Sequence, residues 1–236
     1  MTNKLIVIIF LTTLLINFTS CSFNQYILPQ PASLQAEKHT YIHALQNTYP
    51  KEFTAIQRIV LQIRNKQYDF LGYLAMSRNN AFRATVFSDM GGKFIDLYYN
   101  GEKLELIHKP TGIPDKPIFN GVTYDIKHLF EFIAGNNTYL VRNEKKEISV
   151  VIIISDNKFE EYIFQDNKKE MASSRSVHNG RIIREAWYQN YANFEGFDYP
   201  VPQKIFIKNY QWHYELEIEL LKIVPEVKTH NAFPTE

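Results

Sequence analysis

The chain has 236 residues, with 26 lysines and arginines against 25 aspartates and glutamates, so its formal net charge is +1. The opposite charges are interspersed, and no basic run of the kind that binds nucleic acid is present, so we expect no nucleic acid among the partners. The length suits one larger domain or two small ones. One is expected, because no Pro/Gly/Ser-rich linker divides the chain.

The first 21 residues have the pattern of a bacterial lipoprotein signal. Lys4 precedes an apolar run from Leu5 to Ile16, and a small-residue cleavage site follows at Phe18-Thr19-Ser20-Cys21. A secretory signal needs a basic start, an apolar segment of about 7 to 15 residues and such a site. The sequence therefore predicts a signal peptide over residues 1–20 and lipidation of Cys21, which is the only cysteine of the chain.

Two alternatives for this segment are an uncleaved anchor helix and a cysteine that stands here by coincidence. The anchor is disfavoured because Leu5 to Phe18 is 14 residues, fewer than the roughly 20 that a helix needs to cross a bilayer. An acylated Cys21 leaves no cysteine for a disulfide or a metal site. Ser22 stands where lipoproteins retained in the inner membrane carry aspartate, so we expect an outer-membrane location, facing the periplasm.

The predicted mature chain has 236 − 20 = 216 residues. It begins with a lipidated tether over residues 21–32, in which Pro29 and Pro31 favour an extended spacer. Residues 33–236 are predicted to form a single domain. Its first element is a helix over Leu34–Tyr49, capped by Ser33 and ended before Pro50.

Most of the remaining chain alternates apolar and polar residues with a period of two. In the clearest case, Tyr214, Leu216, Ile218 and Leu220 alternate with glutamates, as in a half-buried antiparallel strand. Turn signals such as Asn179-Gly180 separate many of these patterns. The other predicted strands are Gln57–Asn65, Phe70–Met76, Ala81–Ser88, Lys93–Tyr99, Lys103–His108, Tyr139–Asn143, Glu147–Ile154, Phe159–Gln165, Arg181–Gln189 and Gln203–Asn209.

A second helix is predicted between the N-cap Thr123 and Gly135. Its apolar residues have the helical spacing i, i+3, i+4 and i+7: Ile126, Leu129, Phe130 and Ile133. About eleven meandering strands with one central helix predict a mainly β fold, in which a strongly curved sheet surrounds that helix. The polar stretch from Asn167 to Asn179 has no assigned element.

Several segments carry a resemblance to a known family. They are Phe70–Met76, Asn80–Phe87, Ser88–Gly92, Asn100–Leu106, Leu129–Gly135, Pro202–Ile205 and Phe233-Pro234. In order and pattern these segments resemble LolB, the outer-membrane lipoprotein that receives other lipoproteins from the periplasmic carrier LolA. The resemblance extends over most of the mature chain as a pattern.

The resemblance implies an open antiparallel half-barrel with a helical lid around an apolar cavity. Acyl chains of lipoproteins or glycolipids would occupy that cavity, and a LolA-like periplasmic carrier is one option for the donor. Each buried methylene is worth about 0.8 kcal/mol, so acyl chains need cover while they cross the periplasm. No cofactor and no covalent chemistry are implied, and we expect a monomer.

The residues expected to line the cavity are apolar positions of the predicted strands and the second helix, and ordinary core packing is the alternative for each of them. They are Phe82, Val86, Ile95, Leu97, Leu104, Leu106, Leu129, Phe130, Ile133, Ile205, Ile207, Leu216 and Ile218. In LolB, a protruding leucine between the third and fourth strands helps to insert cargo into the membrane. The matching position is Met90, for which an ordinary hairpin turn is the alternative.

Two patterns suggest enzymes or metal sites, and neither is complete. Ser155-Asp156-Asn157-Lys158 matches both the Ser-x-x-Lys and the Ser-Asp-Asn patterns of penicillin-binding enzymes, but those patterns belong at separate places in one site. His39 and His43 have the spacing of a shared metal site, but no third ligand accompanies them. The sequence therefore predicts no catalytic residue, no metal site and no cofactor.

Two functions from different classes remain open. The first is a lipid-handling receptor that takes up the acylated end of another molecule and releases it into the outer membrane. The second is a structural or assembly lipoprotein that binds a protein partner with the same curved sheet. A continuous apolar cavity of several hundred cubic ångströms favours the first, and an interior filled by its own side chains favours the second.

Overall fold

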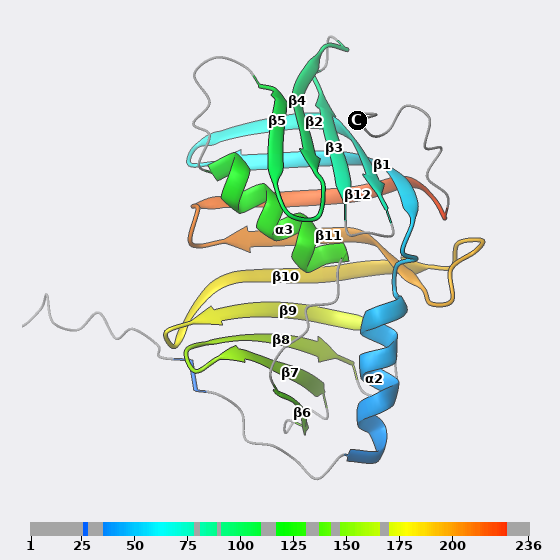
Figure 1. Cartoon of the computed structure of the whole chain (residues 1–236), viewed down its shortest axis with the longest axis vertical. Coiled ribbons are helices and arrows are strands. Elements are labelled where there is room, and N and C mark those ends of the chain that lie inside the picture. The colour runs from blue at the N-terminus through cyan, green and yellow to red at the C-terminus, as the bar shows by residue number, and fades with distance from the viewer. Residues whose placement is uncertain are drawn as a thin grey trace, which may run out of the picture.

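The computed structural model describes residues 26–27, 35–77, 81–88, 91–109, 117–130, 137–142, 147–165 and 170–225. These residues form one antiparallel sheet of twelve strands in the order β5-β4-β3-β2-β1-β12-β11-β10-β9-β8-β7-β6 (Figure 1). The strands β5 and β6 are the two edges, so the sheet is open rather than closed into a barrel. This confirms the expected mainly β, open antiparallel architecture.

The strands vary from five to twelve residues in length. Their bounds are β1 Phe53–Ile63, β2 Lys66–Met76, β3 Phe82–Phe87, β4 Lys93–Tyr99, β5 Leu104–His108, β6 Asn137–Arg142, β7 Ile148–Ser155, β8 Lys158–Phe164, β9 Met171–His178, β10 Arg181–Ala192, β11 Val201–Asn209 and β12 Tyr214–Val224. The helical elements are α2 Gln35–Asn47, the π-helical turn η1 Pro117–Val122 and α3 Thr123–Phe130. None of the described helices combines the length and the apolar character needed to cross a membrane.

The sheet consists of two meanders joined by the pairing of its first and last strands. β1 pairs with β12 over most of its length, from Thr54 opposite Val224 to Ile63 opposite Tyr214. The chain passes from the edge strand β5 to the opposite edge strand β6 through η1 and α3. The sheet curves around α3, which lies across its face in Figure 1. We call the face that α3 covers the inner face.

All eleven predicted strands are present, and the twelfth, β9, is the one that the sequence analysis missed. β9 lies inside the stretch left unassigned, and its sequence MASSRSVH has few large apolar residues. Its serines are buried all the same, with Ser174 2% and Ser176 0% exposed. The turn that follows was predicted correctly: Asn179 and Gly180 have φ angles of 53° and 68°, as a type I′ hairpin requires.

Both predicted helices are present, and the predicted end of the second lies outside the described residues. α2 ends at Asn47 rather than at Tyr49. The Asn47 side chain donates a hydrogen bond of 2.7 Å to the carbonyl of His43, and the Thr48 hydroxyl donates one of 2.7 Å to the carbonyl of Ala44. These bonds satisfy carbonyls that the end of a helix leaves free. α3 begins at Thr123, the expected cap, after the unpredicted η1.

Three clusters of buried side chains make up the core. The first joins β1–β4 with β12 around Phe53, Leu74, Phe82 and Leu97. The second lies between α2 and the strands β6–β8, where Tyr41 packs on Phe164 with their ring centroids 5.1 Å apart. The third lies on β10–β12 and includes Leu129 of α3, together with Ala186, Tyr188, Ile205, Ile207 and Ile218.

Several predictions concern residues outside the described part of the chain. These are the signal peptide over residues 1–20, Cys21, the cap Ser33, the tip residue Met90, and the helix residues Ile133 and Gly135. Of the tether over residues 21–32, only Tyr26 and Ile27 are described. Cleavage, lipidation and the single-domain bounds 33–236 therefore stay predictions.

Candidate functional site

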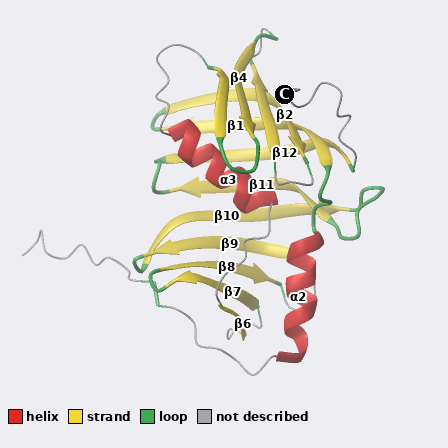
Figure 2. Ribbon diagram, in the orientation of Figure 1, coloured by secondary structure: helices red, strands yellow, loops and turns green. Residues whose placement is uncertain are grey.

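The candidate site is the contact between α3 and the inner face of the sheet. In Figure 2, α3 crosses the strands on that face, whereas α2 lies beside the strands at the far end of the sheet. An α-helix presents residues three and four apart on the same side. α3 has two such sides that meet the sheet, one apolar and one polar.

The apolar side of α3 joins two of the three core clusters. Ile126 and Phe130, with Val122 of η1 just before the helix, pack against the cluster on β1–β4 and β12. Phe130 also packs against the cluster on β10–β12, of which Leu129 is a member. The Phe130 ring lies 4.8 Å from that of Tyr49 and 5.5 Å from that of Phe53, measured between centroids. The ring of Phe130 is therefore the central contact between α3 and the apolar interior.

The polar side of α3 faces one row of side chains that runs across five neighbouring strands. The residues of this row are direct partners in the strand register, so they lie side by side on one face. Each is at most 6% exposed. The polar row comprises Glu160 on β8, Ser176 on β9, Arg184 on β10, Asn209 on β11 and Tyr214 on β12.

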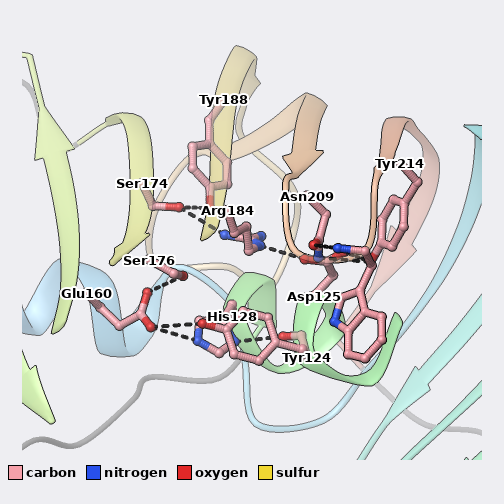
Figure 3. Close-up of polar contacts among 11 residues, drawn as sticks. Tyr124, Asp125, His128, Glu160, Ser174, Ser176, Arg184, Tyr188, Asn209 and Tyr214 are labelled. Atoms are coloured by element: carbon pink, nitrogen blue, oxygen red, sulfur yellow. Dashed lines mark hydrogen bonds and ion pairs between the residues drawn. The ribbon is translucent and has the colours of Figure 1, made fainter. Parts of the chain in front are cut away.

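Asp125 of α3 binds the centre of the polar row (Figure 3). The Arg184 guanidinium donates from Nε to Asp125 Oδ1 at 2.6 Å, and the Tyr214 hydroxyl donates to Asp125 Oδ2. Asn209 in turn donates from Nδ2 to the Tyr214 hydroxyl at 3.2 Å. Arg184 and Asp125 are 1% and 2% exposed, so this ion pair is fully removed from water.

Glu160 accepts three hydrogen bonds at the other end of the polar row. The Tyr124 hydroxyl donates to it at 3.1 Å and the Ser176 hydroxyl at 2.5 Å. His128 Nε2 lies 3.0 Å from the same carboxylate, and His128 Nδ1 lies 2.7 Å from the carbonyl oxygen of Tyr124. The rings of Tyr124 and His128 also stack, with centroids 3.6 Å apart. One helical turn of α3 is therefore bound to β8 through a single carboxylate.

Arg184 is the buried group of this contact that most needs a counter-charge and hydrogen-bond partners. Burial lowers the pKa of its guanidinium, but the Asp125 carboxylate outweighs that effect and the net shift is upward. Arg184 Nη1 also donates to Ser174 Oγ at 3.4 Å, and the Ser174 hydroxyl lies 3.0 Å from that of Tyr188. Its Nη2 atom is buried without a hydrogen-bond partner. A buried charge is costly unless it is paired, so Arg184 depends on Asp125.

The tyrosines at this contact predict a loss of stability at high pH. Burial raises the pKa of Tyr214, and the Asp125 carboxylate raises it further. Burial also raises the pKa of Tyr124, with Glu160 adding to the shift. In the unfolded chain, the tyrosine hydroxyl has a pKa of about 10. Above that pH the unfolded chain releases protons that the folded chain retains, so the free energy of unfolding must decrease.

We therefore expect cooperative alkaline unfolding between about pH 10 and 12, in which the circular dichroism of the sheet and the phenolate absorbance change together. Outside this contact, partial burial and the Glu185 carboxylate also raise the pKa of Tyr210, to about 12. Titration of all fifteen tyrosines near pH 10 while the sheet remains intact would contradict this interpretation.

The predicted cavity residues fall mainly into the two clusters that α3 covers. Eleven of the thirteen belong to these clusters or pack against them. Val86 is half-buried and belongs to neither, and Ile133 is outside the described residues. The eleven are Phe82, Ile95, Leu97, Leu104, Leu106, Leu129, Phe130, Ile205, Ile207, Leu216 and Ile218.

Two hollows are found beside these clusters, and neither is an open apolar cavity. One, of about 300 Å³, is lined mainly by polar residues at the ends of β8–β10, with Met171 and Tyr191 among them. The other, of about 240 Å³, lies at the β11–β12 turn and includes Arg64 and Lys208. In this conformation, the described apolar residues of the inner face pack against one another and against α3.

The patterns that suggested enzymes form ordinary local structure. Ser155 ends β7, and Asp156 and Asn157 form the turn to β8, where the Ser155 hydroxyl donates to the Asn157 side chain at 3.1 Å. His43 Nδ1 lies 2.8 Å from the Tyr199 hydroxyl. Among the residues that the structure describes, no group of three or more His, Cys, Asp or Glu side chains is placed to hold a metal ion.

The sequence analysis missed the polar row, although a signal for it exists. Glu160 has the same strand parity as Tyr162 and Phe164, which are both buried. Arg184 likewise shares its parity with Ala186 and Tyr188. A charged residue on the apolar face of a strand requires a buried partner. That requirement predicts a polar side on the crossing helix.

No family model matches the chain, and no curated protein matches it in sequence. Two solved structures have a similar fold. A LolA superfamily protein from Nitrosomonas europaea aligns with a TM-score of 0.53 and 11% identity, over 81% of this chain and 93% of that chain. A domain described as an outer membrane lipoprotein-sorting protein, from Vibrio parahaemolyticus, aligns with a TM-score of 0.50 and 9% identity, over 83% of this chain and 93% of that chain. With its open twelve-stranded antiparallel sheet, the chain has a LolA-like fold.

Proposed function

We propose that this protein is a lipid-anchored envelope protein that binds acyl chains on the inner face of its sheet. Its cargo is lipoproteins, or a related acylated product such as a glycolipid, and it delivers that cargo to the outer membrane. It is a non-enzymatic, LolB-like receptor, attached through Cys21 and facing the periplasm. The similarity to LolA-like structures supports this proposal, as does the lipoprotein signal in the sequence.

The observation that carries the proposal is the dual attachment of α3. Its apolar side covers two clusters on the inner face, and its polar side binds the polar row through Asp125 and Glu160. Removal of α3 would expose the apolar clusters on β1–β4 and β10–β12, together with the polar row beside them. Acyl chains that replaced the apolar side of α3 would gain about 0.8 kcal/mol for each methylene they bury.

The polar contacts make such a displacement energetically accessible. A buried ion pair such as Asp125 with Arg184 contributes little net stability, because both charges regain hydration when the pair separates into water. α3 is therefore held in one orientation by specific contacts without a large net free energy from that pair. This combination suits a lid that opens when acyl chains compete for the apolar surface beneath it.

The proposal is tested by photocrosslinking in cells from two adjacent residues of β5. Leu106 is half-buried and packs against the cluster on β1–β4, whereas Ile107 points to the opposite face and is 47% exposed. A photoreactive side chain at Leu106 is expected to capture several lipoproteins or their carrier, and the same group at Ile107 is not. Capture of one acylated product would indicate dedicated export of that product.

The alternative function is binding of a protein partner, and the packing of the described inner-face residues against one another and against α3 is the observation that favours it. Both hollows described above are lined largely by polar side chains, and neither exceeds about 300 Å³. Capture of only a non-lipidated protein from Leu106, or of nothing, would support this alternative and reject the lipid-binding proposal.

A further inference from the structure

The predicted tether is bound to the outer face of the sheet at Tyr26. The backbone amide of Tyr26 donates to the carbonyl of Gly180 at 2.9 Å, and its hydroxyl donates to the Glu161 carboxylate. Its ring lies 5.5 Å from that of Phe159, measured between centroids. Glu161 and Phe159 alternate with Glu160, so they face away from α3. Tyr26 thus contacts the sheet through backbone, hydroxyl and ring together.

The Tyr26 contact is part of a cluster of polar side chains on the outer face. Glu161 is only 3% exposed, and its carboxylate also lies 3.5 Å from Arg175 Nη1. Arg175 Nε in turn donates to Glu185 at 3.0 Å. The Tyr26 hydroxyl therefore binds a carboxylate that is already oriented by the sheet.

The Tyr26 contact limits how far Cys21 can lie from the turn between β9 and β10. Cys21 precedes Tyr26 by five residues, and a chain of that length spans at most about 18 Å. β9 has eight residues, so it extends about 26 Å to the opposite end of the sheet. Cys21 can therefore reach the end of the sheet near Gly180 but not the opposite end.

That end of the sheet is basic. Four hairpin turns lie there on one side of the molecule, those of β1–β2, β7–β8, β9–β10 and β11–β12 (Figure 1). Among the described residues of these turns and of the strand ends beside them, the cations are Arg64, Lys66, Lys158 and Arg181, and the one acid is Asp156. The β11–β12 turn also holds Tyr210 and Trp212, residue types that suit a membrane interface.

We propose that this basic end of the sheet rests against anionic lipid headgroups, with Tyr26 fixing its orientation. The inference rests on the proposed lipidation of Cys21, but not on the proposed binding of acyl chains. In this orientation the turns contact the membrane and the strands extend away from it. The polar row then lies near the membrane end of the inner face. At physiological salt, charges attract one another effectively only within about 8 Å, so the cations of these turns must lie this close to the headgroups.

The two tryptophans of the chain report this orientation. Trp212 lies in the β11–β12 turn, and Trp187 lies six residues beyond Arg181 on β10, which is about 20 Å from the turn. The mature chain is coupled through Cys21 to a maleimide lipid in phosphatidylglycerol vesicles that contain a dansyl lipid. We expect several-fold more efficient energy transfer from Trp212, measured in Trp187→Phe, than from Trp187, measured in Trp212→Phe.

Two variants test the cause of this difference. Tyr26→Ala is expected to abolish the difference between the two tryptophans, because the tether no longer holds the sheet. Arg64→Glu combined with Lys158→Glu is expected to reduce it on phosphatidylglycerol vesicles. Vesicles of phosphatidylcholine, which is zwitterionic and has no net charge, should reduce the difference for the parent chain in the same way.

Equal transfer from both tryptophans in the parent chain would overturn the inference, and so would a difference that persists in Tyr26→Ala. Binding of a fluorescent fatty acid is measured in the same samples. Fatty-acid binding with equal energy transfer would reject the orientation and leave the proposed function standing. Unequal transfer without fatty-acid binding would support the orientation and reject the proposed binding of acyl chains.

Discussion

Asp125→Asn is expected to lower the free energy of unfolding by about 3–5 kcal/mol, because it leaves the Arg184 guanidinium buried without a counter-charge. Arg184 is 1% exposed and one of its nitrogens already has no hydrogen-bond partner, and the Glu160 carboxylate acts on it as a charge but forms no ion pair with it among those of the described residues. The substitution keeps the shape of the side chain. Urea denaturation measures the loss, and amide hydrogen exchange shows whether α3 opens first.

Two further variants separate the buried ion pair from a general loss of packing. Arg184→Met in the Asp125→Asn background is expected to restore part of the stability, because an apolar side chain of similar volume removes the uncompensated charge. Arg58→Ala removes an ion pair with Asp69 at the surface, where the two side chains are 52% and 40% exposed. It should leave the urea midpoint close to that of the parent, because solvent-exposed ion pairs contribute little. Equal losses for Asp125→Asn and Arg58→Ala would show that the Arg184 contact does not hold α3.

The architecture could be predicted from local patterns because most strands bury one face and expose the other. Along β12, apolar residues alternate with glutamates, and this period of two is visible without any knowledge of the partner strands. Turns such as Asn179-Gly180 carry their own conformational signal. An open sheet with a central helix follows from these patterns and the family resemblance.

β9 and the polar row could not be predicted in the same way, because their stability comes from neighbours that are distant in the sequence. Ser174 and Ser176 are buried only because Tyr188 and Glu160 on the adjoining strands supply their hydrogen-bond partners. Asp125 of α3 binds Arg184, which is 59 residues further along the chain. A composition rich in serine predicts a loop, and tertiary contacts override that prediction here.

The packing of the expected cavity residues also depends on tertiary contacts that the sequence does not reveal. Their apolar character could be predicted, and most of them belong to the two clusters that α3 joins or pack against these clusters. Whether such a face encloses space or fills it depends on the volumes of side chains from both meanders and from the crossing helix. In this conformation Phe130 and Leu129 of α3 occupy that space. The lid and the acyl chains therefore compete for one surface.

This competition predicts that Phe130→Ala increases the affinity for acyl chains. The Phe130 ring contacts Tyr49 and Phe53 and packs against both apolar clusters that α3 joins. Its loss should weaken the docking of α3 more than it weakens the sheet. If docking weakens by about 1–2 kcal/mol, the population of the open state increases about 5- to 30-fold, and the apparent affinity rises with it. Titration with a dansylated fatty acid measures the change.

Phe164→Ala is the matched control, because it removes the same ring from a cluster that α3 does not touch. Phe164 is 1% exposed and packs against Tyr41 beneath α2. Its truncation should lower the free energy of unfolding by about 3–5 kcal/mol through the cavity it leaves, without tighter binding of the fatty acid. A higher affinity in both variants would attribute the effect to general loosening of the fold. If instead Phe130→Ala weakened binding, the ring would belong to the surface that acyl chains contact, and α3 would be a wall of the binding site rather than its lid.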